Sequence, residues 1–367
     1  MLRKEEEQWL GQVKNEWTMI PEFQVDPAKL KHLAIICDGN RRAANSRNLN
    51  PWVGHRMGVE VIHGILEAGR TWGITNLTFW TWSTENWKRD ADQTKFVMEL
   101  ASTYLRDTRT IDNLTKHQVR FTHFGRKDRV PSSVREAIEH LESETIGFDK
   151  LHLNLALDYG GLDEIARGVG QIVEWIRKGK LTERELLANP AIILGVLDSK
   201  DQPNPDLVIR TGVSEGEIPH TSGFMLPQTI YSSWKFIPEL FPDLTPDILL
   251  KQIKEFDSSD KLFLGELALD GRLRPVNGAL NIAEAAKKNG YKYLLLPYQN
   301  ANEAAAVSGI NIMPLESLKD AMDFLEGRKD IKPADFSPLE SEEILAPDFS
   351  EIKGQEILKG QAASPGI

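Results

Sequence analysis

A short segment near the start of the chain combines a carboxylate, a tight turn and two guanidinium groups. Leu33–Cys37 is an unbroken apolar run, which is typical of a strand buried on both faces of a parallel sheet. Residues 38–42 follow directly and read Asp-Gly-Asn-Arg-Arg, in which the glycine allows a tight turn and a close approach to a ligand. These groups at a strand end suit a metal-bound, multiply charged anion. The alternative is a simple loop in which Asp38 caps a following helix.

Strands and helices that could position such a site alternate along the chain. Apolar runs predict strands at Leu33–Cys37, Leu77–Trp82, Val119–Phe124, Leu151–Leu157 and Leu207–Ile209. Apolar residues at helical spacing predict a helix after each of the first four strands. This alternation predicts an α/β fold with a mostly parallel central sheet, flanked by helices that form right-handed crossovers.

Polar groups and glycines follow every predicted strand. In addition to residues 38–42, such groups occur at Ser83–Trp87, Gly125–Arg126, Asp158–Gly161 and Arg210–Gly212. Ligands of open α/β sheets bind beyond the carboxyl ends of the strands, so these segments are expected to meet at one edge. Asp158 could instead cap the helix that follows it.

Composition excludes several classes of function. The chain has 367 residues, which suggests two domains, and its net charge of −10 leaves no general basic surface for nucleic acid. One cysteine, Cys37, excludes an intrachain disulfide and favours a cytoplasmic setting. We expect no membrane span and no secretory signal. Residues 1–26 are predicted to form a helix and a connector, with Trp9, Val13 and Trp17 docked on the protein's own core; contact with a membrane surface is the alternative.

Five segments resemble, in order and spacing, the signature motifs of the cis-prenyltransferases, the undecaprenyl diphosphate synthase family. They are His32–Asn40, Val53–Gly58, Trp82–Arg89, Leu153–Gly161 and Pro205–Gly212. The third contains Ser-Thr-Glu-Asn-Trp-Lys-Arg, which matches the family's Ser-Thr-Glu-Asn-Trp-x-Arg motif. The resemblance covers residues 27–263. It implies the cis-prenyltransferase fold, with a hydrophobic tunnel walled by helices that begin near residues 58 and 92.

The resemblance also implies an activity and its site. The expected reaction is a Mg²⁺-dependent condensation of isopentenyl diphosphate with an allylic diphosphate such as farnesyl diphosphate. Asp38 is expected to be catalytic and to hold Mg²⁺, and Asn86 and His55 are expected to lie around the reacting groups. Glu85 and Arg89 are expected to brace their loop as an ion pair. The expected substrate-binding residues are Gly39, Asn40, Arg41, Arg42, Ser83, Glu85, Arg89, Arg210, His220 and Ser222.

Three departures from the family pattern leave other functions open. Pro51 and His220 stand where the family has arginines, and Ser233 stands where it has a glutamate. The alternatives are an impaired prenyltransferase-like subunit that binds diphosphates, and a prenyltransferase with an irregular coupling. The family further implies a cytoplasmic homodimer, with peripheral membrane contact for product release as an added expectation.

Residues 264–327 do not continue that pattern. The sequence of this segment first predicts two strands around an Asp270-Gly271 turn. These are followed by a helix, the strand Tyr293–Leu296, a helix from Glu303, the strand Ile310–Met313 and the helix Leu318–Leu325. The segment is similar to part of the Lon-protease-like domain of magnesium-chelatase-like competence ATPases. Asn281 occupies the expected place of the protease lysine, and no phosphate-binding loop is present, so neither peptidase nor ATPase activity is expected. Residues 328–367 are predicted to be a disordered tail.

Overall fold

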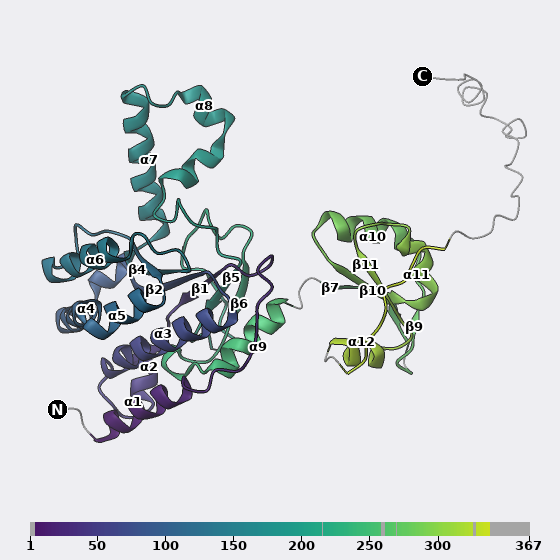
Figure 1. Cartoon of the computed structure of the whole chain (residues 1–367), viewed down its shortest axis with the longest axis horizontal. Coiled ribbons are helices and arrows are strands. Elements are labelled where there is room, and N and C mark those ends of the chain that lie inside the picture. The colour runs from purple at the N-terminus through teal and green to yellow at the C-terminus, as the bar shows by residue number, and fades with distance from the viewer. Residues whose placement is uncertain (1–3, 215, 258–260, 269, 326–327, 338–367) are drawn as a thin grey trace, which may run out of the picture. The chain divides into compact units, whose positions relative to one another are not determined.

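The computed structural model describes residues 4–214, 216–257, 261–268, 270–325 and 328–337. It divides the chain into two compact units, residues 1–258 and 259–367. Figure 1 shows the elements of each unit. Within the described residues, no helix has the length and apolar character needed to cross a membrane.

The first unit is built on a six-stranded parallel sheet in the order β3-β4-β2-β1-β5-β6. Its strands are β1 (His32–Ile36), β2 (Asn76–Ser83), β3 (Val119–Phe124), β4 (Leu151–Tyr159), β5 (Leu207–Arg210) and β6 (Ser233–Phe236). The predicted α/β class and the first five strands are confirmed, with ends that shift by at most two residues. Strand β6 was not among the predicted strands; it is a four-residue edge strand whose side chains are all only partly buried.

Most helices of this unit lie against the sheet, whereas the two that follow β4 extend away from it (Figure 1). The helices are α1 (Lys4–Glu16), α2 (Asn40–Asn45), α3 (Val53–Trp72), α4 (Ala91–Arg106), α5 (Thr108–Lys116), α6 (Ser132–Thr145), α7 (Gly161–Arg177), α8 (Glu183–Ala188) and α9 (Pro246–Asp257). The described part of this unit also contains the short 3₁₀ segments η1 (Thr84–Lys88), η2 (Pro190–Val196) and η3 (Phe241–Asp243).

The central strand β1 is buried on both faces, as its sequence predicts. Leu33 and Ile35 join the main core, whereas Ala34 and Ile36 pack on the opposite face in a cluster that contains Phe224. Alternate side chains of a strand point to opposite faces, so an apolar residue is needed at each position. This burial fixes the strand end at which residues 38–42 begin.

The N-terminal helix docks on the core of the first unit. Trp9, Val13 and Trp17 are buried. Trp17 lies so close to Gly64 of α3 that a Cβ at Gly64 would approach its indole ring to 2.2 Å. The predicted docking is confirmed, and the alternative of a membrane-facing stripe is wrong because its apolar residues are already covered.

A buried polar network holds the amino-terminal ends of the strands together. The imidazole of His32 lies 2.7 Å from the carbonyl oxygen of Pro203 through Nδ1 and 2.7 Å from Thr78 Oγ1 through Nε2. Asn154 Nδ2 also donates to Thr78 Oγ1. The Pro203 carbonyl oxygen can only accept, so Nδ1 carries the proton, and in the neutral ring Nε2 accepts from the Thr78 hydroxyl. Burial lowers the pKa of His32 to about 4.

His32 is expected to make the protein less stable in mild acid. The folded pKa lies below the ordinary value of 6.5, so this contribution to stability is complete above pH 6.5 and is lost as the pH falls toward 4. Between pH 7.5 and 5, we expect the free energy of unfolding to fall by about 2 kcal/mol through this one group. Urea denaturation at both pH values measures it. His32→Gln is the control, because it cannot titrate; an equal pH dependence in both proteins would contradict the assignment.

The second unit has a three-stranded parallel sheet in the order β11-β10-β7 and a two-stranded antiparallel hairpin. Its elements are β7 (Lys261–Phe263), β8 (Glu266–Leu267), β9 (Leu273–Arg274), α10 (Ala279–Lys288), β10 (Tyr293–Pro297), α11 (Tyr298–Ala305), β11 (Asn311–Leu315) and α12 (Leu318–Leu325). Residues 261–263, which the sequence analysis assigned to the prenyltransferase-like segment, pair with β10.

Most predicted elements of this unit are present. The hairpin pairs Glu266 with Arg274 across the turn, and Gly271 has φ 83°. The helix predicted from Glu303 is wrong at its start: α11 begins at Tyr298, directly after Pro297, which ends β10 and occupies the N-cap position. Residues 328–337 contact this unit, since Ala334 N–H donates to the Ile312 carbonyl oxygen. The rest of the predicted tail, 338–367, lies outside the described residues.

Candidate active site

Asp38 lies between two guanidinium groups at the carboxyl end of the sheet. Strands β1 and β5 are paired in parallel so that Ile36 is level with Arg210. This register places Arg210 Nη2 3.1 Å from Asp38 Oδ2. From the other side, Arg42 Nη2 lies 3.2 Å from Asp38 Oδ1. The convergence expected of Asp38, Arg42 and Arg210 is therefore observed.

The backbone around Asp38 is held by Thr211, a residue that the sequence analysis did not single out. The Asp38 N–H donates to Thr211 Oγ1 (3.0 Å), and the Thr211 hydroxyl lies 2.7 Å from the Asp38 carbonyl oxygen. Gly39 has φ 103° and lies against Leu240, where a Cβ would come within 2.8 Å of Cδ2. Gly39, not Asp38, occupies the N-cap position of α2. The alternative that Asp38 caps this helix is therefore wrong, because its carboxylate faces arginines instead.

Arg210 is the centre of a second group of contacts. Its Nη1 donates to the His220 carbonyl oxygen (2.8 Å) and to Ser222 Oγ (2.7 Å), and it lies 3.1 Å from His220 Nδ1. Ser222 Oγ is also 2.9 Å from His220 Nδ1. The Arg210 side chain is only 10% exposed, and its Nε is buried without a hydrogen-bond partner among the described residues. The structure thus joins Arg210, His220 and Ser222 to Asp38 in one cluster.

His55 lies next to this cluster in an electropositive environment. A Cβ at Gly54 would contact the Asn40 carbonyl oxygen, so the start of α3 packs tightly against the start of α2. Burial, followed by the nearby guanidinium groups of Arg89 and Arg41, lowers the pKa of His55 to about 4. The ring is therefore neutral at physiological pH. Its Nε2 is buried with no partner in the described part of the chain.

The charges of Arg41 and Arg89 act on one another beside His55. Burial and the charge of Arg41 lower the pKa of Arg89, while Asp38 acts in the opposite direction. Like charges this close repel, and an anion between them would relieve that repulsion. The two guanidinium groups and His55 therefore form a setting that favours a multiply charged anion over a neutral ligand.

The loop that contains Asn86 is held by its own side chains. Ser83 and Asn86 form a reciprocal capping pair, in which the Ser83 N–H donates to Asn86 Oδ1 (3.2 Å). The expected ion pair between Glu85 and Arg89 is absent among the described residues. Instead, the Arg89 guanidinium lies 5.4 Å from the centre of the Trp82 ring. An aromatic face attracts a cation through its ring electrons, which accounts for this partner.

Asp158 has a structural role that the sequence did not reveal. Its side chain is fully buried, forms an ion pair with Arg129, and accepts a hydrogen bond from Trp87 Nε1 (2.7 Å). The suggestion that Asp158 caps α7 is wrong, since Gly160 occupies the cap position. Arg129 and Asp158 are 29 residues apart, so no local pattern indicates their pairing. The hydrogen bond from Trp87 to Asp158 ties the loop that contains Asn86 to the end of β4.

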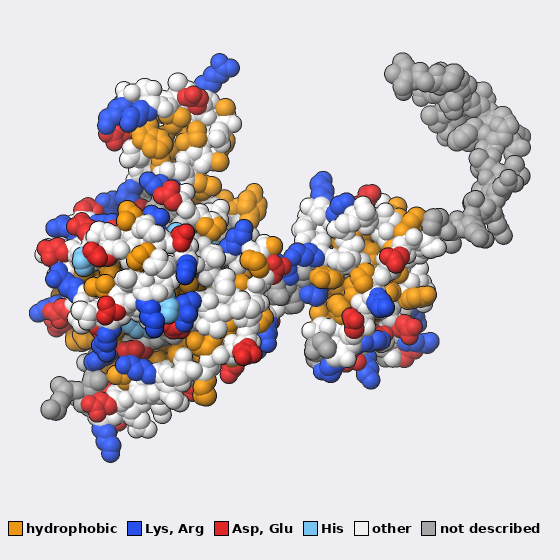
Figure 2. Space-filling model, viewed as in Figure 1, with side chains coloured by type: hydrophobic (Ala, Val, Ile, Leu, Met, Phe, Trp, Pro, Cys, Tyr) orange, Lys and Arg blue, Asp and Glu red, His pale blue; other side chains and the backbone are white. Residues whose placement is uncertain are grey.

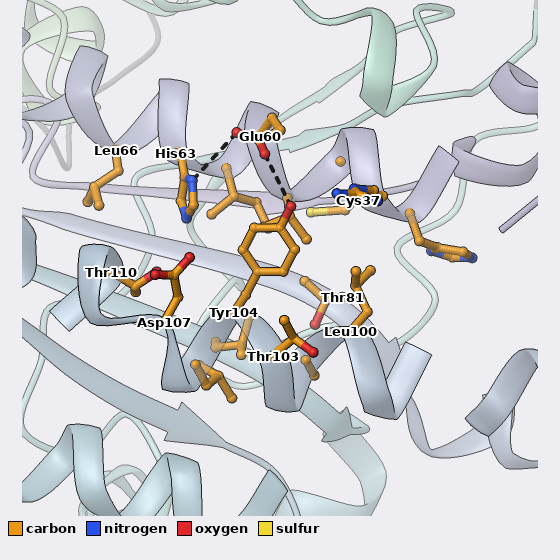
Figure 3. Close-up of a pocket in the computed structure, with 18 of the residues that line it drawn as sticks. Cys37, Glu60, His63, Leu66, Thr81, Leu100, Thr103, Tyr104, Asp107 and Thr110 are labelled. Atoms are coloured by element: carbon orange, nitrogen blue, oxygen red, sulfur yellow. Dashed lines mark hydrogen bonds and ion pairs between the residues drawn. The ribbon is translucent and has the colours of Figure 1, made fainter. Parts of the chain in front are cut away.

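An apolar cavity of about 800 Å³ opens beside the site. Cys37, Asn40 and His55 line one part of it, which connects it to the Asp38 cluster. Helices α3 and α4 form its walls, as predicted for the tunnel, and aromatic and aliphatic side chains from the sheet supply much of the remainder. Figure 3 shows part of this cavity. Its shape and lining suit a long hydrocarbon chain attached to a charged head group.

The donor set fits a magnesium ion that is shared with a ligand. No cluster of three or more His, Cys, Asp or Glu side chains suited to a metal occurs in the described ranges. Asp38 supplies one carboxylate that is 39% exposed. Mg²⁺ is commonly held by one or two carboxylates together with substrate phosphate oxygens and water, so Asp38 with a bound diphosphate is a suitable set.

Comparison with known families gives two matches. The family model for undecaprenyl diphosphate synthase matches residues 36–264. The model for subunit ChlI of Mg-chelatase matches residues 246–300. The second match accords with the magnesium-chelatase-like resemblance noted for the C-terminal segment.

The matches with individual relatives extend over most of the length of each relative. A tritrans,polycis-undecaprenyl-diphosphate synthase (geranylgeranyl-diphosphate specific) of Pyrococcus abyssi is 37% identical over 233 residues, 64% of this chain and 86% of the relative. An isoprenyl transferase of Agrobacterium fabrum is 34% identical over 238 residues, 65% of this chain and 93% of the relative. The crystal structure of lavandulyl diphosphate synthase from Lavandula x intermedia, in complex with dimethylallyl diphosphate, superposes with a TM-score of 0.59. It is 29% identical and covers 63% of this chain and 97% of that chain.

Proposed function

Since this chain belongs to the undecaprenyl diphosphate synthase family and is a prenyltransferase with cis-prenyl diphosphate synthase activity, we propose that residues 27–263 condense isopentenyl diphosphate with an allylic diphosphate such as farnesyl diphosphate. The product would be a polyprenyl diphosphate for isoprenoid lipid carriers. The observation that supports this most directly is the position of Asp38, between Arg42 and Arg210 and beside an apolar cavity of about 800 Å³.

The site can stabilise the charge that the reaction creates. In the proposed reaction, the allylic carbon–oxygen bond breaks and its electron pair leaves with the diphosphate. The double bond of isopentenyl diphosphate supplies the pair for the new carbon–carbon bond, and loss of a proton completes the new double bond. Arg41, Arg42 and Arg89 would bind the leaving diphosphate, and fixed donors of this kind act most strongly where water is excluded. Arg210 with Ser222 would hold the second diphosphate.

Magnesium would be held by Asp38 together with diphosphate oxygens. The family typically uses this ion. When bound, it would neutralise charge on the leaving diphosphate. The other residues act without it: Asn86 is fixed by its pairing with Ser83, and neutral His55 can accept or donate a hydrogen bond beside the bound anion.

A radiolabel assay tests the proposed function. The whole chain would be incubated with labelled isopentenyl diphosphate and dimethylallyl, geranyl, farnesyl or geranylgeranyl diphosphate, with magnesium or with a chelator. We expect an extractable polyprenyl product that requires both an allylic primer and magnesium. Absence of product with all four primers would overturn the proposal. Product mass and NMR connectivity would show whether the coupling is regular, which addresses the irregular alternative.

We also propose that the active protein is a homodimer. Leu162, Val169 and Val173 lie on one face of α7 and are 75%, 47% and 40% exposed. Figure 2 shows hydrophobic side chains gathered over the region of α7 and α8. An apolar stripe at this spacing is normally covered by a partner. Peripheral membrane contact for product release stays a prediction.

The α7 stripe gives the dimer a direct test. Val169→Asp places a charge in the stripe and should shift the protein from dimer to monomer in sedimentation equilibrium. Gln171→Asp makes a charge change of similar kind on another side of α7, where the side chain is exposed, and should leave the dimer intact. A wild-type protein that is monomeric, or equal behaviour of the two variants, would contradict the proposal.

A further inference from the structure

A polar bridge crosses the apolar cavity between its two helical walls. Tyr104 of α4 donates its hydroxyl hydrogen to Glu60 Oε1 of α3 over 3.1 Å. Lys14 of α1 lies 3.5 Å from the same oxygen, and His63 Nδ1 lies 3.9 Å from Glu60 Oε2. Figure 3 shows the Tyr104 ring standing in the cavity with its hydroxyl directed at Glu60.

The bridge lies partway along the cavity. Cys37 and Thr81, near the diphosphate end, are on one side of Tyr104 in Figure 3, whereas Leu66 and Thr110 are on the other. All four residues line the same cavity. Along α3, Glu60 is five residues beyond His55 and six before Leu66, which corresponds to about 8 Å and about 9 Å of helix. A chain that grows away from the Asp38 cluster therefore meets the bridge before it reaches Leu66 and Thr110.

The bridge is a stable obstacle to an apolar chain. The Glu60 side chain is 13% exposed, and its contacts with His63, Lys14 and Tyr104 hold its pKa below the usual range against the effect of burial. Burial and the Glu60 charge raise the pKa of Tyr104 to about 12, so the hydroxyl remains a donor. A hydrocarbon that passed between them would break this hydrogen bond and leave the Tyr104 hydroxyl without this acceptor and the Glu60 carboxylate without this donor, which is costly in an apolar cavity.

We propose that the Glu60–Tyr104 bridge limits the length of the product, by stopping the growing chain before it enters the part of the cavity lined by Leu66 and Thr110. This inference rests on the proposed function. It assigns product length to a hydrogen-bonded pair that spans two helices, and the volume beyond the pair stays unused as long as the bridge is closed.

Product length in a Tyr104 variant tests the bridge. Tyr104→Ala removes both the hydroxyl and the ring, and labelled products should become longer by one or more isoprene units in reversed-phase chromatography. Circular dichroism and Tm show whether the variant folds. Tyr104→Leu, which preserves an apolar side chain on α4 but cannot bond Glu60, is the second variant and should shift the products in the same direction. Unchanged product length in a folded, active variant would overturn the inference.

A double variant separates the bridge from a general loosening of the cavity. Thr110 lies beyond the bridge, so Thr110→Phe should leave product length unchanged in the wild-type background. In the Tyr104→Ala background, the same change should shorten the extended products. Shortening of equal size in both backgrounds would show that chains already pass the bridge, and the inference would be wrong. The same reactions also give the total amount of label incorporated. If the wild type incorporates no label, the proposed function is wrong. If label is incorporated, product length alone decides whether the bridge limits the chain.

Discussion

Replacing Asp38 with alanine is expected to lower kcat by about three orders of magnitude while the fold is retained. Asp38 is the carboxylate that the structure places between Arg42 and Arg210, and the described residues contain no cluster that could hold a metal in its place. Without it, the proposed magnesium ion would lose its protein ligand, and the leaving diphosphate would lose part of its charge neutralisation. The loss should therefore fall on the chemical step.

The fold should survive because the backbone of residue 38 is held independently of its side chain. Thr211 contacts both the N–H and the carbonyl oxygen of Asp38, and the Phe241 N–H donates to the same oxygen over 2.9 Å. The Asp38 carboxylate is 39% exposed, and the buried Arg210 keeps its hydrogen bonds to the His220 carbonyl oxygen and Ser222 when the ion pair is lost.

Asp128→Ala is the matched control for Asp38→Ala. Asp128 is 71% exposed and pairs with Arg126 over 3.6 Å, so its removal also deletes a partner of an arginine, but outside the proposed site. Steady-state kinetics at several magnesium concentrations, with Tm for each protein, would measure both variants. If the activity of Asp38→Ala were within ten-fold of wild type, Asp38 would not be the residue that holds the metal. A large loss in Asp128→Ala would show that the effect is not specific.

The sequence predicted the part of the site that depends on local pattern. The apolar run before Asp38 identifies β1, and the parallel register of β1 and β5 then places Arg210 beside Asp38. Contacts between side chains that are far apart in the sequence could not be predicted from local patterns. Glu85 and Arg89 of the motif were expected to form an ion pair, yet the Arg89 guanidinium lies over the Trp82 ring instead.

The bridge across the cavity illustrates the same limit. Glu60 and Tyr104 are 44 residues apart, on two helices whose sequences show only amphipathic spacing. The sequence therefore predicts that α3 and α4 wall a tunnel, but not that a hydrogen bond crosses it. Likewise, β6 alternates polar and apolar residues, but its four residues are too short a run to identify a strand with certainty from the sequence.

The second large effect is expected at Arg210. Arg210→Lys preserves the positive charge, yet a single ammonium cannot match the planar guanidinium that contacts Asp38, Ser222 and the backbone of His220 at once. Loss of one charge-assisted hydrogen bond costs about 1.5–3 kcal/mol, so we expect the KM for isopentenyl diphosphate to rise by about 10- to 100-fold. The effect should be specific to this substrate, because the proposed allylic diphosphate is bound by Arg41, Arg42 and Arg89.

Separate KM values for the two substrates decide where Arg210 acts. Arg42→Lys is the comparison: the Arg42 side chain is 45% exposed and contacts the opposite oxygen of Asp38, so its loss should affect mainly the allylic diphosphate, and less strongly. If Arg210→Lys instead raised only the KM for the allylic diphosphate, the two diphosphate positions would have to be exchanged. If neither KM changed, the buried cluster of Arg210, His220 and Ser222 would be a structural support for Asp38, and the second diphosphate would have to bind elsewhere.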